Sequence, residues 1–147
     1  MLLDQITEDM KNAMRAKDAL RLSTIRMLLA AIKQREIDER CDSDDAAVLS
    51  IVTKMVKQRQ DAQTQFANAG RTDLAEKEAA EITILQDYLP EMLSNEEIKS
   101  LIQNAISNTQ ASSMKDMGSV MQAVKPHLEH RADMRVVSQL IKEQLQG

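Results

Sequence analysis

Aromatic side chains are nearly absent from this chain. Its 147 residues include one Phe, one Tyr and no Trp, and ten Met supply flexible apolar volume in their place. Glycine and proline are also scarce, at three and two residues, which leaves little material for the turns of a β-sheet. We therefore predict an all-α protein. The shortage of aromatic rings also argues against binding single-stranded nucleic acid by base stacking.

Other absences restrict the class of protein. Cys41 is the single cysteine, so an internal disulfide is excluded and a reducing compartment is indicated. No signal-peptide pattern or bilayer-spanning apolar run is present, so we expect a cytoplasmic location and no membrane partner. The sequence contains no phosphate-cradling glycine loop, nucleophile elbow or paired-cysteine motif. We accordingly predict no catalytic residues, no cofactor and no metal.

The charge balance limits the kind of nucleic acid that the chain can bind. It has 19 Lys and Arg against 23 Asp and Glu, a net charge of −4, which disfavours non-specific coating of DNA or RNA. Residues 1–92 hold 13 basic and 17 acidic groups, whereas residues 93–147 hold 6 of each. We expect no DNA partner. An RNA contact would have to be a local patch in the second segment that reads shape and backbone.

Apolar periodicity predicts four helices in an N-terminal domain, residues 1–92. The expected helices cover about 2–16, about 18–40, the stretch from the acidic segment 41–45 to Ala69, and the stretch from a capping box at Asp73 and Glu76 to Leu89. Gly70 is expected to cap the third helix, and Pro90 to mark the end of the domain.

Three further helices are predicted for residues 93–147, as a small helical bundle. Ser94 with Glu97 and Ser113 with Asp116 have the spacing of capping boxes, and Asp133 can cap the last helix. Pro126 is expected to stop the middle one of the three.

Basic residues flank the turn expected between the last two helices. We predict phosphate contacts from Lys125, His130, Arg131 and Arg135, supported by the backbone amides that open the last helix. Acidic neighbours at 129 and 133 dilute this patch. His127 and His130 could instead share a metal, but no further ligands accompany them, and we interpret both as turn histidines.

Other charged groups are interpreted as structural. Arg26, Lys33 and Arg40, and the later group Lys54, Lys57 and Arg59, are typical of solvated helix faces. A cluster of Arg71, Glu78 and Glu81 is predicted to specify the fold and not to catalyse.

Gly118 has two interpretations. It can admit a neighbouring helix, which we favour because Met114 and Met121 share its face, or it can admit an RNA backbone.

Several of these residues also carry a resemblance to a known family. The C-terminal pattern consists of Gly118-Ser119-Val120-Met121, Pro126 and His130-Arg131-Ala132-Asp133. It resembles the tail domain of the B subunit of the bacterial aspartyl/glutamyl-tRNA amidotransferase. The blocks Lys57-Gln58-Arg59, Ala69-Gly70-Arg71 through Glu78, and Tyr88-Leu89-Pro90 extend the resemblance to the YqeY-like (GatB/YqeY) family over essentially the full length. Gly118, Met121, Ala132, Asp133, Gly70, Arg71 and Pro90 are its structural motif positions.

The resemblance implies a helical front domain followed by a small helical tail. In the amidotransferase that tail contributes to tRNA recognition, and family labels attach a carbon–nitrogen ligase activity with glutamine as amido-N-donor. The residues here provide no site for ATP, Mg²⁺ or ammonia. Our leading hypothesis is a non-catalytic accessory protein that binds tRNA or an aminoacyl-tRNA-handling enzyme. The alternatives are a protein–protein interaction module without an RNA role and a component of amidotransferase-type chemistry.

The chain departs from its relatives at two positions. Relatives typically have Gly at the position of His130, and they often have Gly at the position of Met134. If position 130 requires a positive φ, histidine is tolerated there at some energetic cost.

Overall fold

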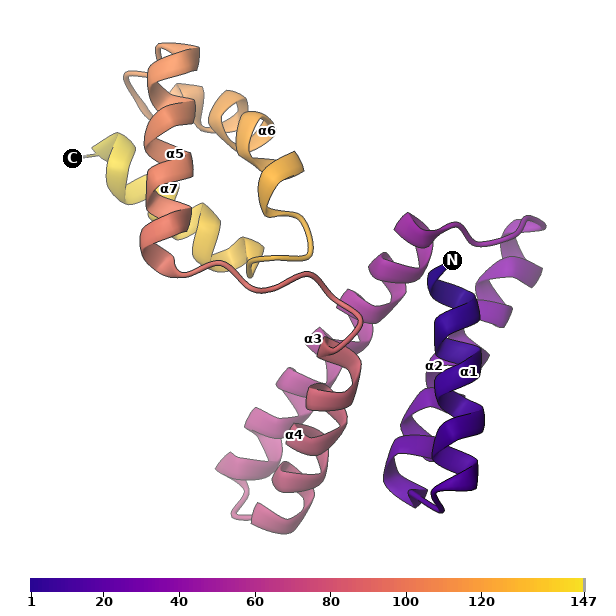
Figure 1. Ribbon diagram of the computed structural model, residues 1–147. Coiled ribbons are helices and arrows are strands. Elements are labelled where there is room, and N and C mark those ends of the chain that lie inside the picture. The colour runs from indigo at the N-terminus through magenta and orange to yellow at the C-terminus, as the bar shows by residue number, and fades with distance from the viewer. Residues whose placement is uncertain (147) are drawn as a thin grey trace. The chain divides into compact units, whose positions relative to one another are not determined.

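The computed structural model describes residues 1–146, and within this range the chain forms seven α-helices, one short 3₁₀ helix and no strand. The all-α prediction is confirmed. The helices fall into two compact units, Met1–Leu89 and Pro90–Gly147 (Figure 1). Across the described residues, no helix combines the length and the apolarity that crossing a bilayer requires.

The N-terminal unit contains four helices. They are α1 (Leu2–Arg15), α2 (Ala19–Glu39), α3 (Asp45–Asn68) and α4 (Thr72–Gln86). Helix α1 packs on α2, and α3 pairs with α4 over a tight turn, so that each pair forms a helical hairpin (Figure 1). Helix α2 also packs against α3 and α4, which joins the two hairpins around one core.

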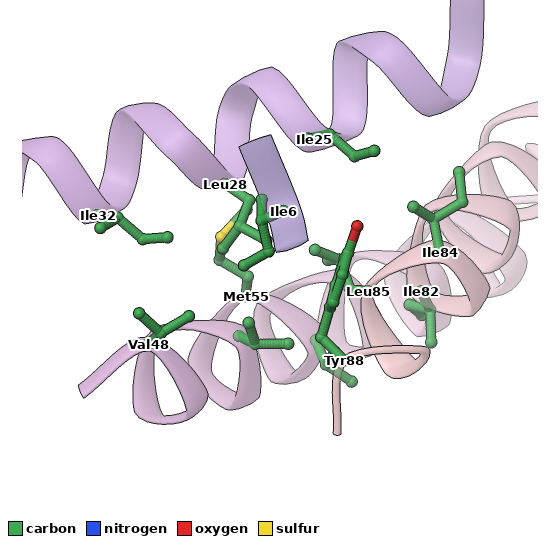
Figure 2. Packing of buried hydrophobic residues seen from close by; sticks show 12 residues of the cluster. Ile6, Ile25, Leu28, Ile32, Val48, Met55, Ile82, Ile84, Leu85 and Tyr88 are labelled. Carbon is green, nitrogen blue, oxygen red and sulfur yellow. The ribbon is translucent and has the colours of Figure 1, made fainter. Parts of the chain in front are cut away.

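Branched aliphatic side chains fill that core. Figure 2 shows side chains of α2 facing those of α3 and α4, with Ile6 of α1 inserted beside Leu28 and Met55. Ile6, Ile25 and Leu28 are completely buried. Because each buried aliphatic side chain contributes about 1.5–3 kcal/mol, burial of these apolar stripes drives the association of the helices.

Side-chain caps fix two of the four helix starts in this unit. Asp18 accepts a hydrogen bond from the Arg21 backbone amide at 3.1 Å, and Asp44 accepts one from the Ala47 amide at 2.8 Å. The cap predicted at Asp73 is wrong: α4 begins at Thr72, so Asp73 already lies in its first turn. There its carboxylate interacts favourably with the positive end of the helix dipole and lies 3.5 Å from the Arg71 guanidinium.

The tail unit contains three α-helices and the 3₁₀ helix. They are α5 (Asn95–Thr109), η1 (Met114–Asp116), α6 (Met117–Leu128) and α7 (Met134–Gln146). The predicted cap at Ser94 is confirmed by its 3.2 Å hydrogen bond from the Glu97 amide. The capping box of Ser113 and Asp116 is confirmed too, although it opens η1 and not α6 directly.

Pro126 does not stop α6, contrary to the prediction. It lies inside the last turn, and the helix continues to Leu128. Proline removes the amide that would bond to the Gln122 carbonyl, but only one intrahelical bond is lost so close to the end. Leu128 is completely buried in the tail core, and this burial holds the last turn in helical form.

A left-handed residue follows several of the helices. Gly70 adopts φ of 74° after α3, and the amides of Gly70 and Arg71 bond back to the carbonyls of Ala67 and Phe66. This is the paired hydrogen-bond pattern of a Schellman motif. Non-glycine residues take positive φ at Lys17, Arg40, Gln110 and His130, where a Cβ makes the conformation unfavourable.

Replacing Gln110 by glycine should therefore stabilise the tail. Gln110 has φ of 57° after α5, and we expect Gln110→Gly to raise the free energy of unfolding by about 0.5–1 kcal/mol. Urea unfolding followed by far-UV circular dichroism measures the change. Gln103→Gly is the matched control inside α5, where glycine should cost about 1 kcal/mol. Destabilisation by both variants would show that position 110 is not strained.

The division predicted after Met92 stays a prediction, because compact packing does not show whether each unit is a domain that folds by itself.

Candidate nucleic-acid interface

The turn between α6 and α7 is built around a left-handed histidine. His130 has φ of 66°, so this position does require the conformation for which glycine is best suited. The Glu129 amide bonds to the Lys125 carbonyl at 2.9 Å, and the Arg131 amide bonds to the Leu128 carbonyl at 3.0 Å. These two bonds close α6 and reverse the chain toward α7.

Arg131 connects this turn to the segment that precedes α5. Its Nε donates to the Glu91 carbonyl at 3.1 Å, and its own carbonyl accepts from the Leu93 amide at 2.9 Å. The predicted phosphate ligand is therefore also a structural residue. A neutral carbonyl does not neutralise a guanidinium, so Arg131 keeps its full positive charge at the turn.

Asp133 caps α7, as predicted. Its Oδ1 accepts from the Arg135 amide at 2.9 Å and lies 3.7 Å from the Arg135 Nε. Arg135 thus shares its charge with a carboxylate. Lys125 lies exposed in the last turn of α6 and has no ion-pair partner among the residues that the structure describes.

The structure brings the four predicted contact residues to the same end of the tail. Lys125 comes from the end of α6, His130 and Arg131 from the turn, and Arg135 from the first turn of α7 (Figure 1). The amide end of α7 faces the same region and adds partial positive charge. His127 lies in the last turn of α6 and not in the turn, and residues 1–146 contain no group of three potential metal ligands.

The other motif residues of the tail have structural positions. A Cβ on Gly118 would meet nothing within 4 Å, so the helix–helix contact predicted there is wrong within this chain. The reason is its exposed position in the first turn of α6. Met121, Ala132 and Met134 are half-buried and pack against the tail core.

In the N-terminal unit, the predicted polar cluster has different members. Glu81 pairs with Arg59, with 3.0 Å between Glu81 Oε2 and Arg59 Nε, and not with Arg71. Arg71 instead pairs with Asp73 at the surface. The sequence did carry a signal that Glu81 is buried, although not one for its partner: Glu81 precedes Ile84 and Leu85 by three and four residues, on the apolar stripe of α4.

Tyr88 forms a second long-range polar contact that the sequence did not indicate. Its hydroxyl donates to Asp9 Oδ2 at 2.6 Å, and Figure 2 shows its ring packed beside Leu85 in the core. Burial, reinforced by the hydrogen bond to Asp9, raises the pKa of Tyr88 well above its ordinary value of 10.0.

The stability of the N-terminal unit should consequently fall as the pH rises above about 10, the ordinary pKa of tyrosine. Above that pH the unfolded chain loses the phenol proton while the folded chain keeps it, so unfolding is favoured. Phenolate absorbance measures the titration of this single tyrosine. Tyr88→Phe should cost about 1 kcal/mol at neutral pH and remove this alkaline dependence. Titration at the ordinary pKa in the folded protein would contradict the expectation.

Comparison with known protein families decides the relationship that the motifs suggested. The model of the family described as Yqey-like protein matches residues 3–145. The chain belongs to the YqeY-like family. This YqeY-like chain is also similar to proteins named altered inheritance of mitochondria protein 41, mitochondrial. The one from Lachancea thermotolerans is 38% identical over 110 residues, covering 73% of this chain and 59% of that protein.

Two further relatives carry the same name. The protein from Kluyveromyces lactis is 39% identical over 111 residues, covering 73% of the YqeY-like chain and 60% of the relative. The protein from Pyrenophora tritici-repentis is 33% identical over 146 residues, covering 97% of this chain and 80% of the relative. The chain thus spans only about three fifths of the first two relatives.

These names overturn the predicted cytoplasmic location. The relatives are named as mitochondrial proteins, and the prediction for this YqeY-like chain is corrected on that finding. Its physical basis was weak, because a lone cysteine fits any reducing compartment and does not distinguish the cytoplasm from the others.

Proposed function

We propose that this YqeY-like chain is a non-catalytic accessory protein whose tail binds the sugar-phosphate backbone of a structured RNA, with tRNA as the first candidate. The observation that supports it is the gathering of Lys125, His130, Arg131 and Arg135 around the α6–α7 turn. The choice of tRNA rests on the resemblance of the tail to that of the amidotransferase B subunit.

The charge distribution fits a small and local RNA contact. Lys125 is exposed without an ion-pair partner in the described part of the chain, and Arg131 contacts only a neutral carbonyl through its Nε. Arg135 must exchange its carboxylate partner for a phosphate, which lowers its net gain. Such a patch neutralises a few phosphates and gives binding that weakens steeply with salt.

Neutralising Lys125 and Arg135 together should weaken binding to tRNA. We expect the double variant Lys125→Gln/Arg135→Gln to lower affinity about tenfold and to reduce the log–log salt slope by about 1–2 units. Fluorescence anisotropy with labelled tRNA across salt concentrations measures both quantities. Arg131 is not changed here, because its loss would also release Glu91 from the turn.

The matched control is Lys115→Gln/Lys142→Gln, which removes the same charge from the same unit. Lys115 lies in η1, at the other end of α6 from Lys125, and Lys142 lies in the second half of α7. This control should keep wild-type binding. Equal weakening by both double variants would mean that net charge acts and not the patch.

Absence of binding by the wild-type chain at low salt would overturn the RNA proposal. A protein partner captured equally well after RNase treatment would then support the interaction-module alternative. Glutamine- or ATP-dependent turnover by the purified chain would contradict the non-catalytic part of the proposal.

A further inference from the structure

The N-terminal unit contains an open hollow of about 430 Å³ among α2, α3 and α4. Its lining includes Ser23 and Met27 from α2, Arg59 from α3, and Lys77, Glu78 and Glu81 from α4. This volume lies in the lower part of the range typical of small-molecule sites. All of these residues belong to Met1–Leu89, so the hollow and the tail patch are built from different residues.

A shielded ion pair forms one wall of the hollow. The Arg59 and Glu81 side chains are only 13% and 7% exposed, with 3.0 Å between Nε and Oε2. The Arg59 Nη1 donates to the Met55 carbonyl at 3.4 Å, whereas Nη2 faces the Met27 sulfur at 3.6 Å. Thioether sulfur is a weak acceptor, so Nη2 retains most of its capacity to bind an anion.

The second oxygen of Glu81 also reaches the hollow. Only Oε2 contacts Arg59, and within residues 1–146 no hydrogen bond to Oε1 occurs. Among the same residues, every buried side-chain nitrogen or oxygen has a hydrogen-bond partner. Oε1 must therefore lie at an accessible surface, and the hollow is the surface that Glu81 lines. One wall consequently presents a carboxylate oxygen beside a guanidinium nitrogen.

We propose that this hollow binds a small zwitterion of the free α-amino acid class. The ligand ammonium would lie against Glu81 and Glu78, and its carboxylate against Arg59 and Lys77. An α-amino acid holds its two charges next to each other, as the Arg59–Glu81 pair does. The ligand can therefore lie antiparallel to the ion pair, with each of its charges against the opposite charge of the pair, and form charge-assisted hydrogen bonds at both ends.

The charge balance of the lining selects a zwitterion over a simple ion. Arg59 and Lys77 supply two positive charges, and Glu78 and Glu81 supply two negative ones. A lone anion or cation would desolvate the shielded Arg59–Glu81 pair while it pairs with only one of the two charges, which is unfavourable. Met27 adds a flexible apolar wall that suits a short aliphatic side chain.

The test uses the full chain and backbone amide NMR titrations. The probes are glycine, L-alanine and L-leucine, with propionate and ethylamine as ligands that carry one charge each. We expect saturable shifts with at least one of the amino acids, located in residues 23–27, 58–62 and 77–81. Propionate and ethylamine should bind at least tenfold more weakly. Absence of saturable shifts with all three amino acids, or equal binding of the single-charge probes, would overturn the proposal.

Two variants keep the test independent of folding. Ser23 is exposed on α2, so Ser23→Trp can fill the hollow without removing the Arg59–Glu81 pair, and it should lower affinity at least tenfold. The matched control is Ser50→Trp, an exposed serine on α3 outside the hollow, which should bind as wild type. Unchanged shifts in a folded Ser23→Trp protein would place the ligand elsewhere and refute the site.

Discussion

Replacing Arg59 by methionine should destabilise the N-terminal unit by about 3 kcal/mol, because Glu81 would then keep its charge in a shielded position without a partner. This destabilisation is at the lower end of the range for broken buried ion pairs, because Glu81 also borders the open hollow. Urea unfolding followed by Tyr88 fluorescence measures the change. This single tyrosine is a specific reporter, because it lies in the core of the N-terminal unit and the chain has no tryptophan.

Two comparisons isolate the cause of this loss. The double variant Arg59→Met/Glu81→Leu should recover most of the stability, because an apolar pair of similar size leaves no charge unpaired. Arg71→Met is the surface control: Arg71 and Asp73 are 59% and 70% exposed, and such pairs contribute about 0–1 kcal/mol. If Arg59→Met and Arg71→Met lower the free energy of unfolding by the same amount, the shielded pair has no special energetic role.

The second large effect is expected in the tail. Ile102 is completely buried in a core that three short helices share, and Ile102→Ala should cost about 3 kcal/mol. A bundle of this size has little stability to spare, so the tail of this variant should be largely unfolded at 25 °C. Far-UV circular dichroism should report the lost helix, while Tyr88 fluorescence reports the N-terminal unit.

This experiment also tests the predicted division into residues 1–92 and 93–147. If the two segments are independent domains, Tyr88 fluorescence and its urea midpoint should stay at the wild-type values in Ile102→Ala. Val136→Ala is the control, because Val136 is 39% exposed on α7 and its truncation should leave the tail folded. A shared loss of both signals in Ile102→Ala would show that the chain unfolds as one unit.

The sequence was sufficient to predict the helices, because each one carries an apolar stripe at helical spacing. Local caps were also predictable where the bond spans a few residues, as at Ser94 and at Asp133. The cap at Asp73 failed because Gly70 and Arg71 set the start of α4 from outside the helix. Pro126 was given too much weight, since burial of Leu128 maintains the last turn of α6.

Long-range polar contacts were beyond the sequence. Arg59 and Glu81 are 22 residues apart, and Asp9 and Tyr88 are 79 apart, so local spacing rules do not connect them. The basic residues of the tail flank one turn in the sequence, and the bounds of α6 and α7 keep them around that turn. The bond from Arg131 to Glu91 depends on how the tail folds back on its own beginning, which periodicity does not encode.

Arg131 bonds to the start of the tail through both its side chain and its backbone carbonyl, and this has a mechanical consequence. The Arg131 side chain bonds to the Glu91 carbonyl, and the Arg131 carbonyl accepts from the Leu93 amide, so the α6–α7 turn is fastened to the segment that precedes α5. A ligand that draws the Arg131 guanidinium away would break the bond to Glu91, and the bond from the Leu93 amide would then hold the turn to the start of the tail alone.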